Sequence, residues 1–243
     1  MSILLIPIAP LSKTKSRLRD CFSKEQLREL TIAMLKDLGK TLTEVTCFDQ
    51  KIVYCNSSEI LDIAREYNLI GIKEELETSP KSFDKVIEEL NWIAVDRFDA
   101  KQTILSFLDL ILISAQNFNE INNLTIKNQL VVCPAIHSAG ISVLGRNPPK
   151  IISSYFSDPN TPSLVALLNN ATKKGIDQIA IYDSFRAGFD IDIKQDLILA
   201  YEYLKIFNLI HSSVFQFLKN NLRLTLKKKC ANDNRTFEIT QGD

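Results

Sequence analysis

The sequence SILLIPIAPLSKTKSRL, at residues 2–18, joins a continuous apolar run to a loop that carries three cations. An apolar run ended by a proline is typical of a strand that is covered on both faces. Ligands of open α/β sheets bind beyond the carboxyl ends of the strands, so Lys13, Lys15 and Arg17 are placed to neutralise a polyphosphate. From charge alone, a solvated loop that leads into a helix is favoured instead.

Segments with strand and helix character alternate along the rest of the chain. Ser23 and Gln26 form a capping-box pattern at the start of a helix. Thr161 is a predicted cap, with Pro162 at the first helical position. Further strands are predicted at residues 51–55, 104–113, 130–133, 141–144 and 178–182, with a strand end at 189–192, and further helices at 58–67, 82–97 and from 194. This alternation predicts an α/β fold with one mostly parallel sheet in three layers.

The composition is that of a globular protein without a general attraction for polyanions. The 243 residues include 29 Lys and Arg and 29 Asp and Glu, so the formal net charge is zero. This balance argues against binding to nucleic acid or to anionic membranes and favours small-molecule chemistry. Five cysteines without a C-x-x-C pair, and only two histidines, exclude the usual zinc-finger spacings. Cysteines in apolar runs indicate free thiols and a cytoplasmic location.

The last part of the chain differs in character from the rest. Apolar residues keep helical spacing from residue 201 to residue 218, which predicts a helix that is either unusually long or broken near His211. Three lysines at residues 227–229 and a polar tail follow. We therefore divide the chain into a domain at residues 1–204 and a helical extension with a polar tail at residues 205–243.

Asp109 lies inside the apolar run at residues 104–113. Burying a carboxylate there is costly unless it meets a cation or lies at the solvated end of the strand. A metal ion or an ammonium group is therefore an expected partner. The alternative is an aspartate just past the strand that caps the next turn, and the periodicity of the sequence does not separate the two.

Asp190 and Asp192 flank Ile191 shortly before a predicted helix. In an extended segment, two residues at this spacing point to one face. Their carboxylates are hard oxygen ligands of the kind that Mg²⁺ prefers, and together with Asp109 they could form one magnesium site. From the Asp-x-Asp pattern alone the favoured alternative is that Asp192 caps the following helix while Asp190 is solvated.

Taken together, these segments resemble the CofC/FbiD family, which comprises the 2-phospho-L-lactate or phosphoenolpyruvate guanylyltransferases of deazaflavin coenzyme F420 biosynthesis. The matching motifs within residues 3–204 are I-P-I at 6–8, P-L at 10–11, K-S-R-L at 15–18, A-M-L-K-D-L at 33–38, D-L-I-L-I at 109–113 and D-I-D with D-L at 190–197. The resemblance implies a GT-A-like, MobA-type nucleotidyltransferase fold of Rossmann-like character, with an extra C-terminal helix.

The resemblance also implies a reaction, in which a phosphate oxygen of a small phosphorylated acid attacks the α-phosphorus of GTP and releases pyrophosphate. Mg²⁺, or Mn²⁺ in its place, would be held by Asp109, Asp190 and Asp192. The implied catalytic residues are Lys15, Arg17 and Asp109. The implied nucleotide-binding residues are Pro10, Leu11, Lys13, Lys15, Arg17 and Asp84, and the implied acceptor-binding residues are Gly140, Asn160 and Ser163. The expected partners are GTP and the acid, with a homodimer as a further candidate.

Departures from the family pattern keep two alternatives open. Ala9 stands where the family has a lysine, Asp84 where it has an asparagine, and Phe107 and Ile111 where it has prolines around Asp109. One alternative is a diverged homologue that binds a nucleotide without turnover. The other is a nucleotidyltransferase for a different phosphorylated acceptor, such as a sugar phosphate or a pterin.

Overall fold

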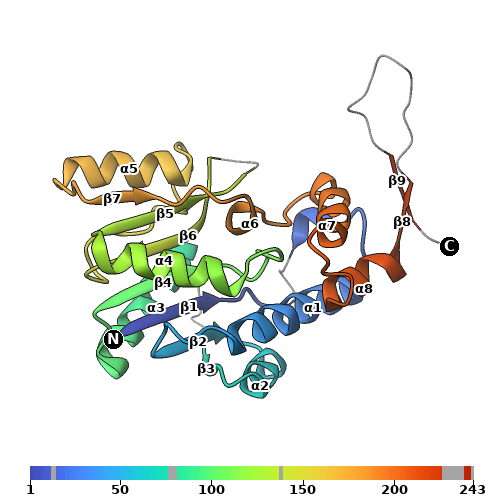
Figure 1. Ribbon diagram of the computed structural model, residues 1–243, viewed down its shortest axis with the longest axis horizontal. Coiled ribbons are helices and arrows are strands. Elements are labelled where there is room, and N and C mark those ends of the chain that lie inside the picture. The colour runs from blue at the N-terminus through green and yellow to red at the C-terminus, as the bar shows by residue number, and fades with distance from the viewer. Residues whose placement is uncertain (12–14, 76–80, 137–138, 226–237, 242–243) are drawn as a thin grey trace, which may run out of the picture.

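The computed structural model describes residues 1–11, 15–75, 81–136, 139–225 and 238–241. Seven strands form one sheet in the order β3-β2-β1-β4-β6-β5-β7 (Figure 1). Their bounds are β1 Ser2–Pro7, β2 Gln50–Cys55, β3 Ile70–Lys73, β4 Gln102–Ser106, β5 Leu130–Pro134, β6 Ile141–Arg146 and β7 Ile179–Ile181. Strand β6 is antiparallel to β4 and β5, whereas the other pairs in this sheet are parallel. The prediction of a mostly parallel sheet is confirmed.

Helices cover both faces of this sheet. The helices with three or more turns in this domain are α1 Lys24–Thr43, α3 Phe83–Phe98, α4 Ala115–Lys127 and α5 Ser163–Lys173, and a shorter one is α2 Ser58–Glu66. Leu4 and Ile6 of β1 pack in one cluster with α1, α2 and α4. Ile3 and Leu5 pack in another cluster with α3 and α5. Because successive strand residues point to opposite faces, the uniformly apolar β1 serves both cores, and the three-layer prediction is confirmed.

Predicted caps mark the starts of two helices. The hydroxyl of Ser23 accepts from the N–H of Gln26 (3.2 Å), and the Gln26 side chain accepts from the N–H of Ser23 (2.9 Å). These reciprocal bonds form the capping box of α1. Ser82 caps α3 in the predicted position by accepting from the N–H of Lys85 (3.2 Å). The start of α1, the helix that follows the cationic loop, is therefore determined by its local sequence.

Helix α5 begins one residue later than the sequence predicts. Pro162 is its N-cap and Ser163 its first helical residue, so the prediction of Thr161 as cap with Pro162 at the first helical position is wrong. The reason lies in the preceding turn, where the N–H of Thr161 donates to the Asp158 side chain (3.2 Å). Thr161 thus belongs to this turn.

The strand predicted at residues 104–113 is correct only in its first part. Strand β4 ends at Ser106, where its register with β6 also ends, opposite Val143. Leu110 and Leu112 belong to the loop that follows β4 and are buried, so their apolar character reflects core packing and not strand pairing. The strand end predicted at residues 189–192 is wrong for the same reason, because this segment is a loop whose Ile191 is buried.

Helix α4 and strand β3 are among the elements that the sequence-based prediction missed. Helix α4 starts at a capping box of Ser114 and Asn117, and it buries Phe118 and Ile121. Its Asn and Gln residues mask this apolar stripe. The four-residue β3 completes the sheet beside β2.

Two helices near the end of the chain pack in one cluster with α1. Helix α7 (Lys194–Ile206) and helix α8 (Ser213–Asn221) are separate, which confirms the predicted break near His211. The Asp37 carboxylate accepts from the N–H groups of Ser213 (2.7 Å) and Val214 (2.8 Å), and thereby ties α8 to α1. The predicted domain boundary at residue 204 lies inside α7. Strand β8 (Leu222–Thr225) then pairs with β9 (Glu238–Gln241).

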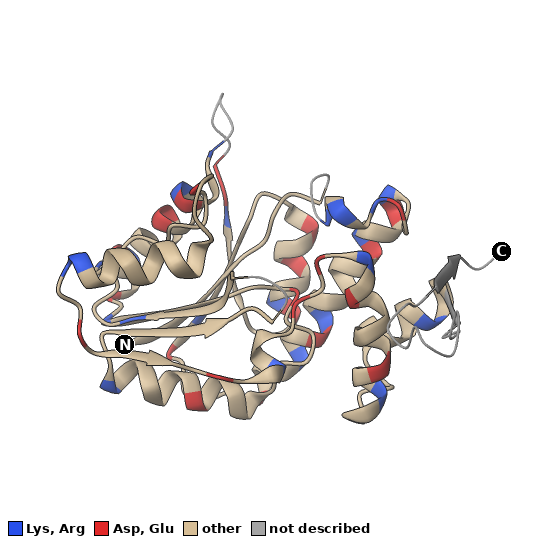
Figure 2. Cartoon of the chain, turned by 90° about the horizontal axis from the view of Figure 1, so that it is seen from above, with Lys and Arg blue, Asp and Glu red and all other residues tan. Residues whose placement is uncertain are grey.

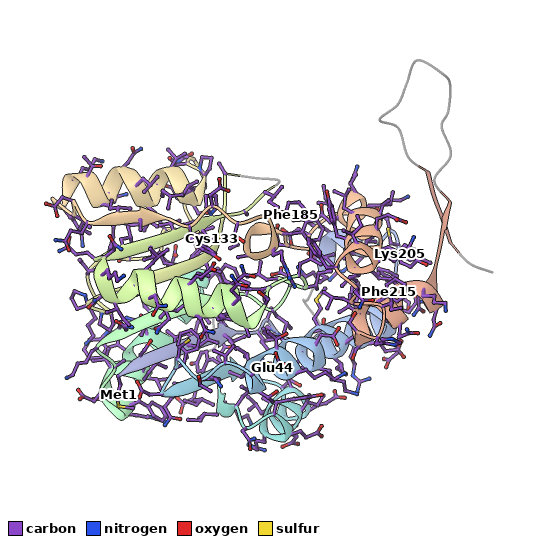
Figure 3. All side chains as sticks on the ribbon, viewed as in Figure 1. Met1, Glu44, Cys133, Phe185, Lys205 and Phe215 are labelled. Atoms are coloured by element: carbon purple, nitrogen blue, oxygen red, sulfur yellow. The ribbon has the colours of Figure 1, made fainter. Side chains whose placement is uncertain are left out.

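Figure 3 shows the labelled Lys205 and Phe215 in this helical region, away from Met1, and Cys133 within the sheet. The carboxyl ends of the parallel strands point toward α6 (Phe185–Gly188) and α7 (Figure 1). Lys and Arg alternate with Asp and Glu over the helices (Figure 2). No helix in the described part of the chain is both long enough and apolar enough to cross a bilayer.

Candidate active site

Lys15 projects from the loop after β1 into a group of oxygen atoms. Its backbone is left-handed (φ 47°), directly before the short 3-10 helix Ser16–Leu18. Its ammonium donates to the carboxylates of Asp109 and Asp192 (3.1 Å to the latter) and to the backbone oxygen of Ile191 (2.5 Å). The side chain is only 10% exposed. Lys15 therefore joins the loop after β1 to the segments that follow β4 and α6.

Asp109 lies three residues beyond the end of β4. Its backbone oxygen accepts from the N–H groups of Ile111 (2.9 Å) and Ile191 (3.4 Å), which brings the two acidic segments together. Its carboxylate pairs with Lys15 through Oδ2, while Oδ1 is buried without a hydrogen-bond partner among the described residues. The expectation that Asp109 meets a cation is thus met by an ammonium group. Its remaining oxygen has no compensation for its burial.

Asp192 faces the cationic loop and does not cap the helix that follows it. It is 44% exposed and accepts from Arg17 (2.9 Å) as well as from Lys15. The N–H groups of Asp192 and Ile193 donate instead to the buried Asp196 carboxylate (2.7 and 2.8 Å). Asp196 therefore holds the acidic segment at the start of α7 and leaves the Asp192 carboxylate available to the site.

The surroundings of Asp190 disfavour its negative charge. Burial raises its pKa to about 6, and the nearby charges of Asp109 and Asp192 add to this rise, while Lys15 opposes it. Burial alone would lower the pKa of Lys15, but attraction to Asp109 and Asp192 outweighs it and raises that pKa. The site is thus a group of mutually repelling carboxylates whose main compensation is the ammonium group of Lys15.

These residues also fit a divalent cation chemically. Three carboxylates supply hard oxygen ligands, Asp109 has an uncompensated oxygen, and Asp190 is destabilised as an anion. As they stand, however, no three acidic, histidine or cysteine side chains among the described residues are grouped closely enough to hold a metal ion. The ammonium of Lys15 lies between Asp109 and Asp192 instead. The magnesium site stays a prediction.

Two cavities, of about 360 and 420 Å³, meet at this group. Their shared wall consists of Arg17, Phe83, Phe107, Asp109 and Asp192. The first cavity extends over the end of β1 and the cationic loop, and its other lining residues include Pro7, Ile8, Ala9 and Lys15. The second extends toward β6 and α5, and its other lining residues include Gly140, Ser142, Phe156, Ser163 and Asp190. This arrangement offers two adjoining chambers with cations and carboxylates between them.

The predicted nucleotide-binding residues are spread over several environments. Lys15 and Arg17 line the first cavity, whereas Pro10 and Leu11 are not among its described lining residues. Lys13 lies outside the described residues. Asp84, at the start of α3, accepts from the backbone of the loop before α5. Their roles toward a nucleotide stay predictions.

The predicted acceptor-binding residues are divided in the same way. Gly140 and Ser163 line the second cavity beside Asp109 and Asp190. Asn160 is exposed, and its N–H donates to the Asp158 side chain (2.8 Å) in the turn before α5. Sequence reasoning did not identify Phe83, Phe107 and Phe156 as site residues. The substitution of a family proline by Phe107 was the one available signal.

The fold is that of solved nucleotidyltransferase structures. A cytidylyltransferase from Leptospira borgpetersenii has the same fold, with a TM-score of 0.56 and 13% identity over 92% of this chain and 99% of its own. A Desulfovibrio desulfuricans G20 protein, proposed to be a nucleotide-diphospho-sugar transferase, has a TM-score of 0.71 and 12% identity over 90% of this chain and 94% of its own.

Sequence similarity identifies the family to which this chain belongs. Residues 1–236 match the CofC-like guanylyl transferases, and the chain belongs to this family. It is 26% identical to the 2-phospho-L-lactate guanylyltransferase of Methanocaldococcus vulcanius, over 80% of this chain and 82% of the relative. It is 25% identical to the phosphoenolpyruvate guanylyltransferase of Thermobaculum terrenum, over 80% of each chain.

Proposed function

We propose that this protein transfers GMP from GTP to 2-phospho-L-lactate or phosphoenolpyruvate and releases pyrophosphate, a step of coenzyme F420 biosynthesis. The observation that carries the proposal is the meeting of two cavities at Arg17, Asp109 and Asp192. Two phosphorylated substrates need adjoining chambers with charged groups between them. The names of the relatives indicate the nucleotide and the acids.

Free cysteines in the described chain support a cytoplasmic location.

The reaction requires positioning and charge neutralisation more than proton transfer. A phosphate oxygen of the acid bonds to the α-phosphorus of GTP, while the bond from that phosphorus to the oxygen bridging to the β-phosphate breaks and pyrophosphate leaves. The attacking phosphate is already ionised, so no general base is needed. Orienting the two reactants and neutralising their phosphates are therefore the main tasks of the protein.

The aspartates and the loop cations divide these tasks. Asp109, Asp190 and Asp192 would hold Mg²⁺ or Mn²⁺, which neutralises charge on the phosphates and polarises them toward attack. Arg17, which is exposed beside Asp192, is placed to bind phosphate oxygens in the first cavity. Lys15 pairs with Asp109 and Asp192 when no such ion is bound, and it also lines the first cavity. We assign this first cavity to the nucleotide and the second, which Gly140 and Ser163 line, to the acceptor acid.

Pyrophosphate release tests the proposal directly. The purified protein is incubated with GTP and Mg²⁺, and with 2-phospho-L-lactate or phosphoenolpyruvate, while ATP, CTP and UTP replace GTP in parallel reactions. We expect pyrophosphate and a GMP adduct of the acid, with GTP as the best donor. GTP binding without pyrophosphate from any acid would support the non-catalytic alternative. Turnover only with a sugar phosphate or a pterin would support the other alternative.

A further inference from the structure

Three phenylalanines from separate elements form one aromatic group, of which Phe83 and Phe107 line both cavities and Phe156 lines the second. The ring centroids of Phe83 and Phe107 are 5.8 Å apart, those of Phe83 and Phe156 5.6 Å, and those of Phe107 and Phe156 5.5 Å. Phe83 begins α3, Phe107 follows β4 and Phe156 belongs to the loop before α5. These distances lie in the range of favourable aromatic pairs, so the rings support one another as a unit. We call these three residues the aromatic wall.

The aromatic wall lines the second cavity, which charged residues line as well. All three rings line that cavity together with Gly140 and Ser163. An acceptor in this cavity would therefore meet charged side chains and ring surfaces. Its phosphate and carboxylate groups would pair with the charged and polar side chains, which leaves its remaining carbon for the rings.

Asp84 holds the loop that carries Phe156. Its carboxylate accepts from the hydroxyl of Ser154 and from the N–H groups of Phe156 and Ser157, both at 2.8 Å. Tyr155, between these partners, has a left-handed backbone (φ 59°), which is unfavourable for a bulky residue. Such a conformation persists only where its surroundings enforce it. The bonds on either side of Tyr155 show that Asp84 fixes this turn and thereby the position of Phe156.

We propose that the aromatic wall selects an acceptor whose third carbon bears no hydroxyl group, and that Asp84 is a positioning residue for this wall. The inference rests on the proposed function and deepens it. A methyl or methylene group packs on the rings without loss. A hydroxyl group at the same place would lose its hydrogen bonds to water, because ring faces offer no equivalent partner. Apolar pockets reject an added hydroxyl by up to about 10²-fold.

A matched pair of acceptors measures this selection. 2-Phospho-L-glycerate has the configuration of 2-phospho-L-lactate and differs from it by one hydroxyl on the third carbon. We expect kcat/KM of the wild-type protein to favour the lactate by about 10- to 100-fold. Phe156→Ser and Phe107→Ser should each reduce this ratio at least about threefold, since they remove a ring and supply a hydrogen-bonding group.

Control variants distinguish a specific effect of the aromatic wall from a general loss of structure or activity. Phe156→Leu and Phe107→Leu keep an apolar surface and should retain most of the wild-type ratio, and they also serve if a serine variant does not fold. Trp92→Ser changes a 58% exposed aromatic residue on the same helix as Phe83 and should leave the ratio unchanged. A wild-type ratio near one, or folded serine variants with the wild-type ratio, would overturn the inference.

The Asp84→Ala variant distinguishes a positioning role from direct nucleotide binding. If Asp84 positions Phe156, the acceptor ratio falls as in Phe156→Ser and the KM for GTP stays within about twofold of the wild-type value. A raised KM for GTP at an unchanged acceptor ratio would refute the positioning role and support the nucleotide-binding prediction.

Failure of the proposed function gives a different result. In that case no acid yields pyrophosphate from GTP, and the same pair of acids is compared by calorimetric binding to the wild-type protein and the serine variants. Tighter wild-type binding of the lactate, lost in the serine variants, would still support the aromatic wall. Equal binding of the two acids, or binding of neither, would overturn it.

Discussion

Two groups of residues line the acceptor cavity, one charged and one aromatic, and different interactions hold each group in place. On the charged side, Lys15 reaches Asp109 and Asp192 across 94 and 177 positions of the sequence, and each group depends on the others for compensation. On the aromatic side, three rings pack by contact alone, and a single turn held by Asp84 places one of them. The difference is the basis of our two proposals, in which the charged residues promote the reaction and the aromatic residues select the acid.

The sharpest test of the charged side removes one carboxylate. Asp109→Asn keeps the size of the side chain and loses its charge, so we expect the rate of pyrophosphate release to fall by about 10²- to 10³-fold with the fold intact by circular dichroism. Asp62→Asn, on the exposed face of α2, serves as the matched control and should retain activity. Unchanged turnover in Asp109→Asn would remove Asp109 from the reaction.

Removal of the buried ammonium should have the next largest effect. Lys15→Met keeps the length of the side chain but leaves the carboxylates without their cation. We expect the KM for GTP to rise by about 10- to 100-fold, the usual range for a lost charge-assisted bond. Lys36→Met, on the exposed side of α1, is the control. An unaltered KM for GTP in Lys15→Met would contradict the phosphate-binding role of Lys15.

Asp190→Asn tests the electrostatic cost of the crowded carboxylates. The pKa of Asp190 in the folded protein, about 6, lies above its ordinary value, so its negative charge opposes folding above pH 6. In the presence of EDTA we therefore expect the variant to melt several degrees higher than the wild type at pH 7.5. This gain should shrink as the pH falls from 6 toward 4, where the wild-type residue is neutral too. A gain that does not vary with pH would refute this cause.

The smallest expected effect is that of a change at Ser163, which lines the second cavity. Ser163→Ala removes one neutral hydroxyl at the start of α5, and we expect the KM for the acid to rise about fivefold, with the KM for GTP unchanged. Steady-state kinetics at saturating GTP measure this change. A larger effect on GTP than on the acid would reverse the assignment of the two chambers.

The charged side was predictable in part because Lys15 and Asp109 each follow a strand. Lys15 follows an apolar run, and Asp109 stands out as a charge within another, so elementary burial costs already point to a shared partner. The parallel order of β1 and β4 then brings their carboxyl ends together. The mostly parallel sheet and its layers were predicted from the alternation of strand-like and helix-like segments. The capping box of α1 was predicted from the spacing of Ser23 and Gln26.

The aromatic side could not be predicted because nothing in the sequence joins its members. Phe83, Phe107 and Phe156 look like ordinary core residues, and they meet only through loops whose paths depend on the whole fold. The resemblance predicted Asp84 as a nucleotide-binding residue, whereas its bonds to the backbone of the Phe156 loop required the structure. Apolarity within residues 104–113 likewise does not distinguish a strand from a buried loop.

The central claim is that Asp109, Asp190 and Asp192 together hold a divalent cation. Its most direct test is a titration of Mn²⁺ into the protein, with the free ion followed by electron paramagnetic resonance. We expect the wild-type protein and Asp62→Asn to deplete the free Mn²⁺ signal alike, and Asp109→Asn to bind the ion at least about tenfold more weakly. Equal depletion by Asp109→Asn and the wild type would contradict the account.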